Sequence, residues 1–402
     1  MKALAVIWLV VFISLMGYGI TTVPFPLVAD QFGASAFWKS FGGPGVFSTF
    51  QLLAMPFWGR LSDAYGRRPV LLTTLAGSVL GYLWLATADS LTMLLAARAF
   101  GGIMSGNLAT AMAYASDITP DDNRARNLGV VGSAYGVGFA AGPPLGGWLA
   151  DLAGHGVSLF WPCVVAAVLS AIATLGTLML LRESLAPQLR RPFGATPASP
   201  LVAAPDVPWW RGINPRLSAL LVASLAVGFG SSALQSVFPF WALGEFGLSL
   251  RQIGVLFASM GAMAAVSQML LIGPATQRFG ERVVTIASLF AVLLALVVLP
   301  FAHGEAGLWF GILLFGLAIG LFFPASSSLA TGEAQADRRG AVLGAINAAG
   351  TAGRIAGPAL AGPLYFGLGS WTTFAAGGAL TLLGLFAMRW GYAERSQAGF
   401  GE

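Results

Sequence analysis

The sequence predicts an all-α polytopic membrane protein, with twelve transmembrane helices arranged as two pseudo-symmetric six-helix bundles. First, 56% of its 402 residues are hydrophobic and only 9% are charged, which would leave a soluble protein with large exposed apolar patches. Second, apolar stretches of about 20 residues, the length that crosses a bilayer as a helix, recur along the whole chain. Third, the two halves repeat each other. A transmembrane β-barrel would instead show short segments of alternating hydrophobicity.

The predicted spans fall into two groups of six, separated by a polar segment rich in Pro and Arg. The twelve spans cover approximately residues 3–28, 42–58, 69–88, 91–115, 127–150, 158–181, 216–240, 250–272, 282–301, 307–330, 340–364 and 370–391. We therefore predict an N-terminal six-helix bundle, a cytoplasmic linker, a C-terminal six-helix bundle and a cytoplasmic tail. These parts cover residues 1–181, 182–215, 216–391 and 392–402.

The distribution of basic residues predicts the orientation in the membrane. With the N-terminus in the cytoplasm, 17 of the 21 Lys and Arg residues fall in cytoplasmic segments, and only Lys39 and Arg251 fall outside. This asymmetry follows the positive-inside rule and places both termini in the cytoplasm. It also accounts for the net charge of +5, so the basic composition gives no reason to expect a nucleic acid partner.

The two halves match at a nearly constant offset. The stretch GRLSDAYGRRPV at 59–70 matches GPATQRFGERVV at 273–284, with an offset of 214. The stretch GPPLGG at 142–147 matches GPALAG at 357–362, with an offset of 215. One offset shared by separate segments indicates a duplicated six-helix unit, which is how transporters of the alternating-access type are built.

The segment between the second and third predicted spans concentrates charge in a chain that otherwise avoids it. Arg60, Asp63, Arg67 and Arg68 fall within nine positions. The flanking glycines permit tight turns and close helix approach, and the Asp63 carboxylate can lie against the positive end of a helix. The spacing indicates a latch at the membrane surface. The alternative, topology and surface anchoring, explains the arginines but not the Gly-Asp-Gly spacing.

This segment resembles the pattern G-x-L-a-D-r-x-G-r-[kr]-x-x-l of the major facilitator superfamily, and the resemblance covers nearly the whole chain. The matching positions are Gly59, Leu61, Asp63, Gly66, Arg67, Arg68 and Leu71. Within the family, the chain resembles the twelve-span drug:proton antiporters, and its N-terminal half resembles the tetracycline exporters. The resemblance implies that Asp63 contacts the eleventh helix and bridges the two halves in the outward-facing state. We expect Asp117, at the end of the fourth span, to pair with Arg67.

Only Arg98 and Arg354, among the basic residues, fall inside predicted spans and away from the first or last residues of those spans. A charge there is costly and normally faces a cavity where it has a function. Arg98 resembles the arginine of the family pattern l-x-x-R-x-x-q-G. The repeat places Leu313 opposite Arg98 and Phe139 opposite Arg354, so each charge belongs to one half alone. We expect both arginines to serve the central cavity. An arginine that extends its charge outward to the headgroups is the alternative for Arg98.

The fifth span resembles the antiporter pattern g-x-x-x-G-P-x-x-G-G. The matching residues are Gly138, Gly142, Pro143, Gly146 and Gly147. Spaced glycines allow close helix packing, and proline bends the helix. The full pattern favours an exporter. Generic GxxxG packing is the alternative.

Polar side chains well inside the spans are few, and we expect four of them to serve the cavity. They are Gln51, Asn107, Gln235 and Asn347. A mostly apolar, aromatic cavity with scattered amides would suit lipophilic substrates. Hydrogen bonding between helices is an equally good account of any single one of them.

No carboxylate falls near the middle of any predicted span. The tetracycline exporters carry an acidic residue in the third helix, where this chain has Gly81, so the resemblance argues against tetracycline as the substrate. The proton route is unassigned, and its candidates are Asp117, Asp63 and Asp30.

These features together predict a secondary active exporter of small lipophilic molecules, powered by proton antiport and working as a monomer in the bacterial inner membrane. A sugar or metabolite exporter or facilitator is the alternative, followed by a non-transporting receptor. The sequence shows no nucleophile–base constellation of an enzyme. We expect no cofactor beyond the proton gradient, and no metal, because Cys163, His155 and His303 form no recognisable metal-binding pattern.

Overall fold

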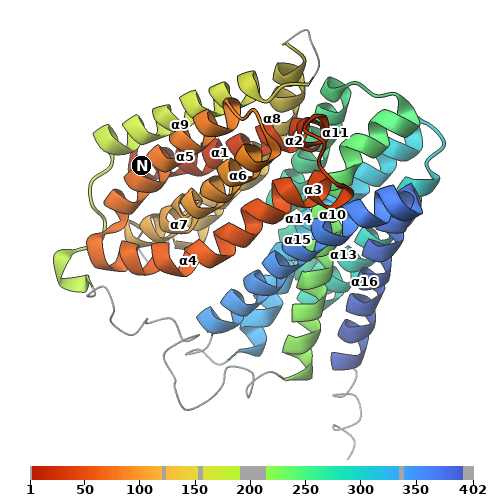
Figure 1. The fold of residues 1–402 in the computed structure, drawn as a ribbon. Helices are drawn as coiled ribbons and strands as arrows, with labels where there is room; N and C mark the ends of the chain where they lie inside the picture. The colour runs from red at the N-terminus through yellow and green to blue at the C-terminus, as the bar shows by residue number, and fades with distance from the viewer. Residues whose placement is uncertain (1, 120–123, 153–156, 191–213, 335–338, 393–402) are drawn as a thin grey trace, which may run out of the picture. The chain divides into compact units, whose positions relative to one another are not determined.

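The computed structural model describes residues 2–119, 124–152, 157–190, 214–334 and 339–392, which are almost entirely helical (Figure 1). The predicted tail from residue 393 and most of the predicted linker, residues 191–213, lie outside the described residues. Eight helices in the described part are long and apolar enough to cross a membrane. The all-α membrane fold is therefore confirmed.

The N-terminal half is built from helices joined by short connections. Its elements are α1 (Lys2–Thr22), α2 (Pro24–Gln31), α3 (Ala36–Ser40), the π-helix η1 (Phe41–Gly45), α4 (Val46–Tyr65), α5 (Arg67–Ala86), α6 (Leu91–Met104), α7 (Asn107–Asp117), α8 (Arg124–Asp151), α9 (Phe160–Leu180) and the 3-10 helix η3 (Pro187–Leu189). Two predicted spans are interrupted. The first continues from α1 into α2 at Val23, directly before Pro24, and the fourth is divided into α6 and α7.

The C-terminal half repeats this plan. Its elements are α10 (Pro215–Phe246), α11 (Leu250–Val266), the π-helix η5 (Ser267–Leu271), α12 (Ile272–Phe279), α13 (Glu281–Val298), the 3-10 helix η6 (Leu299–Phe301), α14 (Glu305–Glu333), α15 (Arg339–Leu368) and α16 (Ser370–Gly391). Prolines lie inside α8, α10, α14 and α15, where apolar neighbours and adjacent helices hold the chain helical.

Contacts between residues divide the chain into two compact units. The first unit holds the chain through Ala195 together with Gln235–Ala265, and the second holds Thr196–Leu234 together with the chain from Val266. The division between units therefore falls inside α10 and at the end of α11. The predicted boundaries of the six-helix bundles stay predictions.

In the first unit, α1 packs along α8 and α9, α5 packs on α9, and α4 packs on α6. A hydrophobic core of this unit contains aliphatic side chains such as Ile7, Val11 and Leu75, which have no exposed surface or almost none. In the second unit, α13 packs on α14 and α16, and α15 packs on α16.

The structure repeats where the sequence repeats. Gly66 separates α4 from α5, and Gly280 separates α12 from α13. Both glycines have positive φ angles, 108° and 79°, which other residues rarely adopt. Their backbone N–H groups donate to the backbone carbonyls of Ser62 and Thr276. These two residues are 214 positions apart, which is the offset of the repeat. The same turn is therefore built twice.

Candidate functional site

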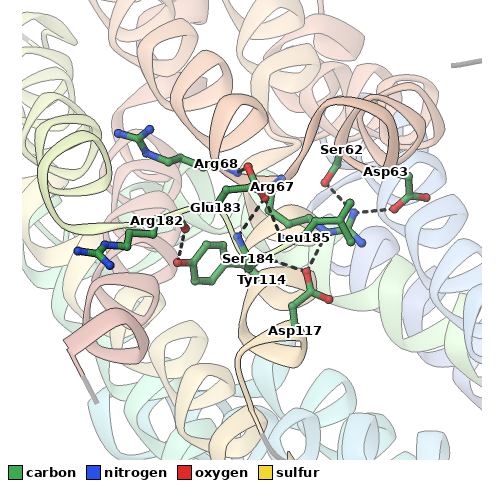
Figure 2. A network of polar contacts seen from close by, with 10 residues as sticks. All are labelled: Ser62, Asp63, Arg67, Arg68, Tyr114, Asp117, Arg182, Glu183, Ser184 and Leu185. Carbon is green, nitrogen blue, oxygen red and sulfur yellow. Dashed lines mark hydrogen bonds and ion pairs between the residues drawn. The ribbon is translucent and has the colours of Figure 1, made fainter. Parts of the chain in front are cut away.

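A polar network surrounds the turn between α4 and α5 (Figure 2). Arg67, the first residue of α5, is at its centre. Its Nη1 donates to Asp63 Oδ1 at 2.6 Å and to Ser62 Oγ at 2.8 Å. Its Nε donates to Asp117 Oδ2 at 3.1 Å, from the last turn of α7. The predicted pairing of Arg67 with Asp117 is present.

Glu183, which follows α9, is a part of this network that the sequence does not reveal. Its carboxylate accepts the backbone N–H groups of Arg67 and Arg68, at 2.8 and 3.1 Å. The first N–H groups of a helix lack partners within the helix and carry partial positive charge. Glu183 therefore caps α5, whose N-cap residue Gly66 has no side chain that could do so. The contact expected of Asp63 is a different one, with the N-terminal end of the eleventh predicted span, and it stays a prediction.

Further contacts tie the same four segments together. Ser184 Oγ donates to Asp117 Oδ2 at 3.0 Å, and Tyr114 Oη donates to the Arg182 carbonyl at 2.7 Å. Arg68 Nη2 donates to the Leu178 carbonyl at 2.7 Å, near the end of α9. The ends of α4, α7 and α9 are thus all joined to the start of α5. The role of this network as a latch between halves stays a prediction.

The second unit carries a different charge cluster at its repeated turn. Arg216 Nη1, from the start of α10, donates to both carboxylate oxygens of Glu333, at 2.8 and 3.0 Å. The guanidinium carbons of Arg216 and Arg282 lie 5.2 and 5.0 Å from the ring centroid of Tyr392. Glu281, the first residue of α13, accepts a hydrogen bond from Ser328. An acid therefore occupies the first position of α13, where α5 has Arg67.

Arg98 is buried in the first unit, with 4% of its surface exposed. Its Nη1 donates to Thr21 Oγ1 of α1 at 3.0 Å. Its guanidinium carbon lies 5.2, 5.3 and 5.7 Å from the ring centroids of Phe25, Phe47 and Tyr18. The side chain thus points into the bundle. If it faced lipid instead, its charge would cost about 2.5–3.5 kcal/mol on insertion scales.

Asn107 lies beside the break between α6 and α7. It is buried, and its Nδ2 donates to Ser14 Oγ of α1 at 2.9 Å. The carbonyl of Ile103, near the end of α6, accepts the Trp58 indole N–H at 2.5 Å. Broken helices inside a membrane are tolerated where other groups satisfy the freed backbone. Arg98 and Asn107 lie on opposite sides of this break.

The other predicted cavity residues are dispersed. Gln51 and Gln235 are half-buried, and Asn347 is exposed. Arg354 is half-buried in α15, where its Nη2 donates to Thr351 Oγ1 at 2.8 Å and its carbonyl accepts from Ser232 at 3.0 Å. Their role in a shared cavity stays a prediction.

The three proton-route candidates each form an ion pair. Asp63 and Asp117 both pair with Arg67, and Asp30 Oδ1 lies 2.5 Å from Lys39 Nζ. Loss of the charge of Asp63 or of Asp117 would therefore remove one of the two carboxylates that pair with Arg67.

The glycines of the fifth predicted span, which is α8, lie directly against α1. A Cβ atom added at Gly138 would lie 2.6 Å from the Phe12 carbonyl oxygen, and one at Gly142 would lie 2.6 Å from that of Met16. Gly146 leaves still less room, against Ile20. The three glycines are four positions apart, so they form one face of the helix. This spacing lets α1 and α8 approach at backbone distance.

The opposite face of α8 packs in the same way against α11. A Cβ atom added at Gly254 would lie 2.6 Å from the Pro143 carbonyl oxygen, and Gly147 packs on the Leu250 carbonyl. The second unit repeats the first contact, because Gly353 and Gly357 of α15 lie against Leu225 and Phe229 of α10. Gly357 is the counterpart of Gly142 at the offset of 215.

An apolar hollow of about 350 Å³ opens between α1 and α8. It is lined by Leu4, Ala5, Trp8 and Val130. The Trp8 ring stacks on Phe12 with centroids 5.3 Å apart, and its N–H donates to Ser133 Oγ at 3.1 Å. Such a surface can accept part of a lipophilic molecule.

Two repeated halves of the chain, glycine-packed helices and a polar network at the turn between α4 and α5 are typical of a secondary transporter rather than an enzyme. The family model of the Major Facilitator Superfamily matches residues 7–241 and 220–400. The chain therefore belongs to the major facilitator superfamily, as its sequence pattern predicts.

Among curated relatives, the chain is 34% identical to the tetracycline resistance protein, class C, of Escherichia coli over 359 residues, 87% of each chain. It is 30% identical to the human major facilitator superfamily domain-containing protein 10 over 372 residues, which are 87% of this chain and 78% of the relative. The crystal structure of the human organic anion transporter MFSD10 (TETRAN) matches with a TM-score of 0.72 at 24% identity, covering 96% of this chain and 99% of that one.

Proposed function

We propose that this protein exports small lipophilic molecules by proton antiport across the bacterial inner membrane, as a monomer with both termini in the cytoplasm. The packing of α8 carries the proposal, because Gly138, Gly142 and Gly146, which match the antiporter pattern, lie directly against α1. The similarity to tetracycline resistance proteins over most of the chain supports export as the direction of transport.

The chemistry of the first unit supports a lipophilic substrate. The hollow beside Trp8 is apolar, and aromatic rings surround Arg98. Since the two relatives carry different substrates in their names, similarity alone does not choose between them.

Tetracycline is not the substrate that we propose. Gly81, which stands where tetracycline exporters have an acidic residue, is buried against Phe100. A Cβ atom there would lie 3.2 Å from the Phe100 ring, so the site has no room for a carboxylate without rearrangement. Expression of this protein should therefore give little tetracycline resistance.

Dye accumulation in intact cells tests the proposal. Cells that express the protein should accumulate less of a lipophilic dye than cells with an empty vector, and a protonophore should abolish the difference. Equal accumulation in both cell types under both conditions would contradict the proposal. A pH-independent flux specific for sugars would favour the alternative of a sugar or metabolite transporter.

A further inference from the structure

The surroundings of Arg98 differ from those of Arg67 and Arg216. Arg67 and Arg216 pair with carboxylates. No ion pair of the described residues includes Arg98, although it is 96% buried. Its Nε atom is buried without a hydrogen-bond partner. A buried, permanently charged group normally has a counter-ion.

Aromatic rings take the place that a counter-ion would fill. The faces of Phe25, Phe47 and Tyr18 attract the guanidinium, since an aromatic face is the negative side of the ring quadrupole. These rings partly compensate for the loss of water, but they leave the charge of Arg98 without neutralisation. The site is therefore complementary to an anion that is not part of it.

Two of the three rings form a cover at the surface of the unit. Phe25 is buried, whereas Tyr18 and Phe47 are half-buried, and their ring centroids lie 5.1 Å apart. Phe47 follows the π-helix η1, which contains Pro44, so its turn lacks the regular hydrogen bonding of an α-helix. Movement of these two ring side chains would uncover part of the guanidinium, while Phe25 and Thr21 keep their contacts with it.

We propose that Arg98 binds the anionic group, a carboxylate or a similar planar oxyanion, of a small lipophilic substrate once the Tyr18 and Phe47 rings move aside. The free Nε can form one arm of a bidentate pair with such a group. The rings would then contact the apolar part of the same molecule. This inference rests on the proposed export function and names the substrate class for it.

The direction of transport agrees with this class. A bacterial membrane is negative inside, so its potential drives an anion outward. An exporter of monovalent anions can draw on this potential even where the proton supplies little energy. The absence of a mid-span carboxylate from the sequence is then no obstacle to binding, because an acid beside Arg98 would compete with the substrate.

Uptake into everted vesicles tests the proposal, because export in cells appears there as uptake. The probes are p-aminohippurate, which is an aryl carboxylate, its neutral methyl ester, and the cationic dye ethidium. The variants are Arg98→Gln and Arg98→Lys, with Arg389→Gln as the control. Arg389 lies exposed in the last turn of α16, so its loss removes the same charge without touching the proposed site.

We expect the wild type and Arg389→Gln to take up the carboxylate, and Arg98→Gln to lose about tenfold or more of that uptake. Arg98→Lys should raise the KM for the carboxylate and leave that for the ester unchanged, because it keeps the charge but loses the planar fork. Phe47→Leu, which shortens the cover, should change the KM for the carboxylate as well. This variant keeps the test valid if loss of Arg98 prevents folding.

The outcomes separate the two claims. Wild-type uptake of ethidium or the ester without the carboxylate would leave the export function standing and overturn the anion site. Equal loss of all probes in a well-expressed Arg98→Lys, with no effect of Phe47→Leu, would also overturn it and assign Arg98 a structural role. If the wild type takes up no probe, the export function fails, and the anion site fails with it.

Discussion

Glu183 Oε1 accepts a hydrogen bond of 2.8 Å from the backbone N–H of Arg67, across 116 positions of sequence. The second unit places a negative charge at the start of the equivalent helix in another way, since Glu281 is itself the first residue of α13. Because Arg67 occupies the equivalent position in α5 and is engaged with Asp63 and Asp117, the negative charge for this helix end comes from another segment. Both copies of the turn thus have a carboxylate at the N-terminal end of the following helix, but the residue that supplies it differs.

Glu183→Gln should weaken this cap. The neutral amide loses the favourable interaction with the helix end and with the adjacent arginines, so we expect a loss of about 1–2 kcal/mol in stability. Thermal unfolding of the purified protein measures the effect. Glu245→Gln, at an exposed position near the end of α10, is the matched control and should unfold like the wild type. An unchanged unfolding temperature for Glu183→Gln would show that the cap contributes nothing.

Asp63→Asn should abolish transport while the protein remains inserted and abundant. Asp63 is half-exposed, so its loss costs little stability, and the latch hypothesis assigns its charge to the transport cycle. Dye efflux, normalised to the amount of protein in the membrane, is the measurement. Normal efflux by a normally expressed Asp63→Asn protein would contradict the latch hypothesis.

Gly142→Ala should be strongly destabilising, because its methyl group would lie 2.6 Å from the Met16 carbonyl oxygen. Overpacking of this kind costs about 1–3 kcal/mol and would force α1 and α8 apart. Gly132→Ala on the same helix is the control, because no atom lies within 4 Å of its added Cβ. Comparable stability and dye efflux for the two variants would contradict the assigned role of the glycine face.

Tyr392 gives a prediction at high pH. The pKa of Tyr392 is raised from 10.0 to about 12, mainly by burial and to a lesser degree by the negative charge of the nearby Glu333. The folded state thus holds this proton more tightly than the unfolded state does, so stability is complete below pH 10 and falls as the pH rises towards 12. Tyr392→Phe should show a smaller fall over this window when unfolding is followed at several pH values. Identical pH profiles would contradict the assignment.

The same variant tests a buried hydroxyl. Tyr392 Oη is buried without a hydrogen-bond partner. Tyr392→Phe removes this group and keeps the ring beneath Arg216 and Arg282, so at neutral pH we expect unchanged stability or a gain of up to about 1 kcal/mol. A marked loss of stability at neutral pH would show that the hydroxyl has a favourable role.

The sequence predicts those parts of the fold that depend on local pattern. The spans follow from hydropathy, the duplicated turns at Gly66 and Gly280 from the constant offset, and the tight face of α8 from glycines four positions apart. The Arg67–Asp117 pair could also be predicted, because each residue lies beside the end of a predicted span.

Contacts set by tertiary packing were not predictable in this way. Glu183 accepts hydrogen bonds from backbone N–H groups. Almost every residue has such a group, so the sequence does not show which residues Glu183 will contact. The charge of Arg98 is visible in the sequence, but its rings come from α1, α2 and α4 and meet only when the unit folds. The break between α6 and α7 interrupts a continuous apolar stretch, and Gly106, which packs against Trp58, marks it only in the structure.

The most direct test of the central claim is dye uptake into everted membrane vesicles with an imposed pH gradient, acid inside. If the protein is a proton-coupled exporter, vesicles that contain it should concentrate a lipophilic dye while the gradient lasts and release it when nigericin collapses the gradient. Vesicles with Asp63→Asn in equal amount should behave like vesicles without the protein. Dye uptake that does not respond to the pH gradient, or that equals the uptake of empty vesicles, would contradict the claim.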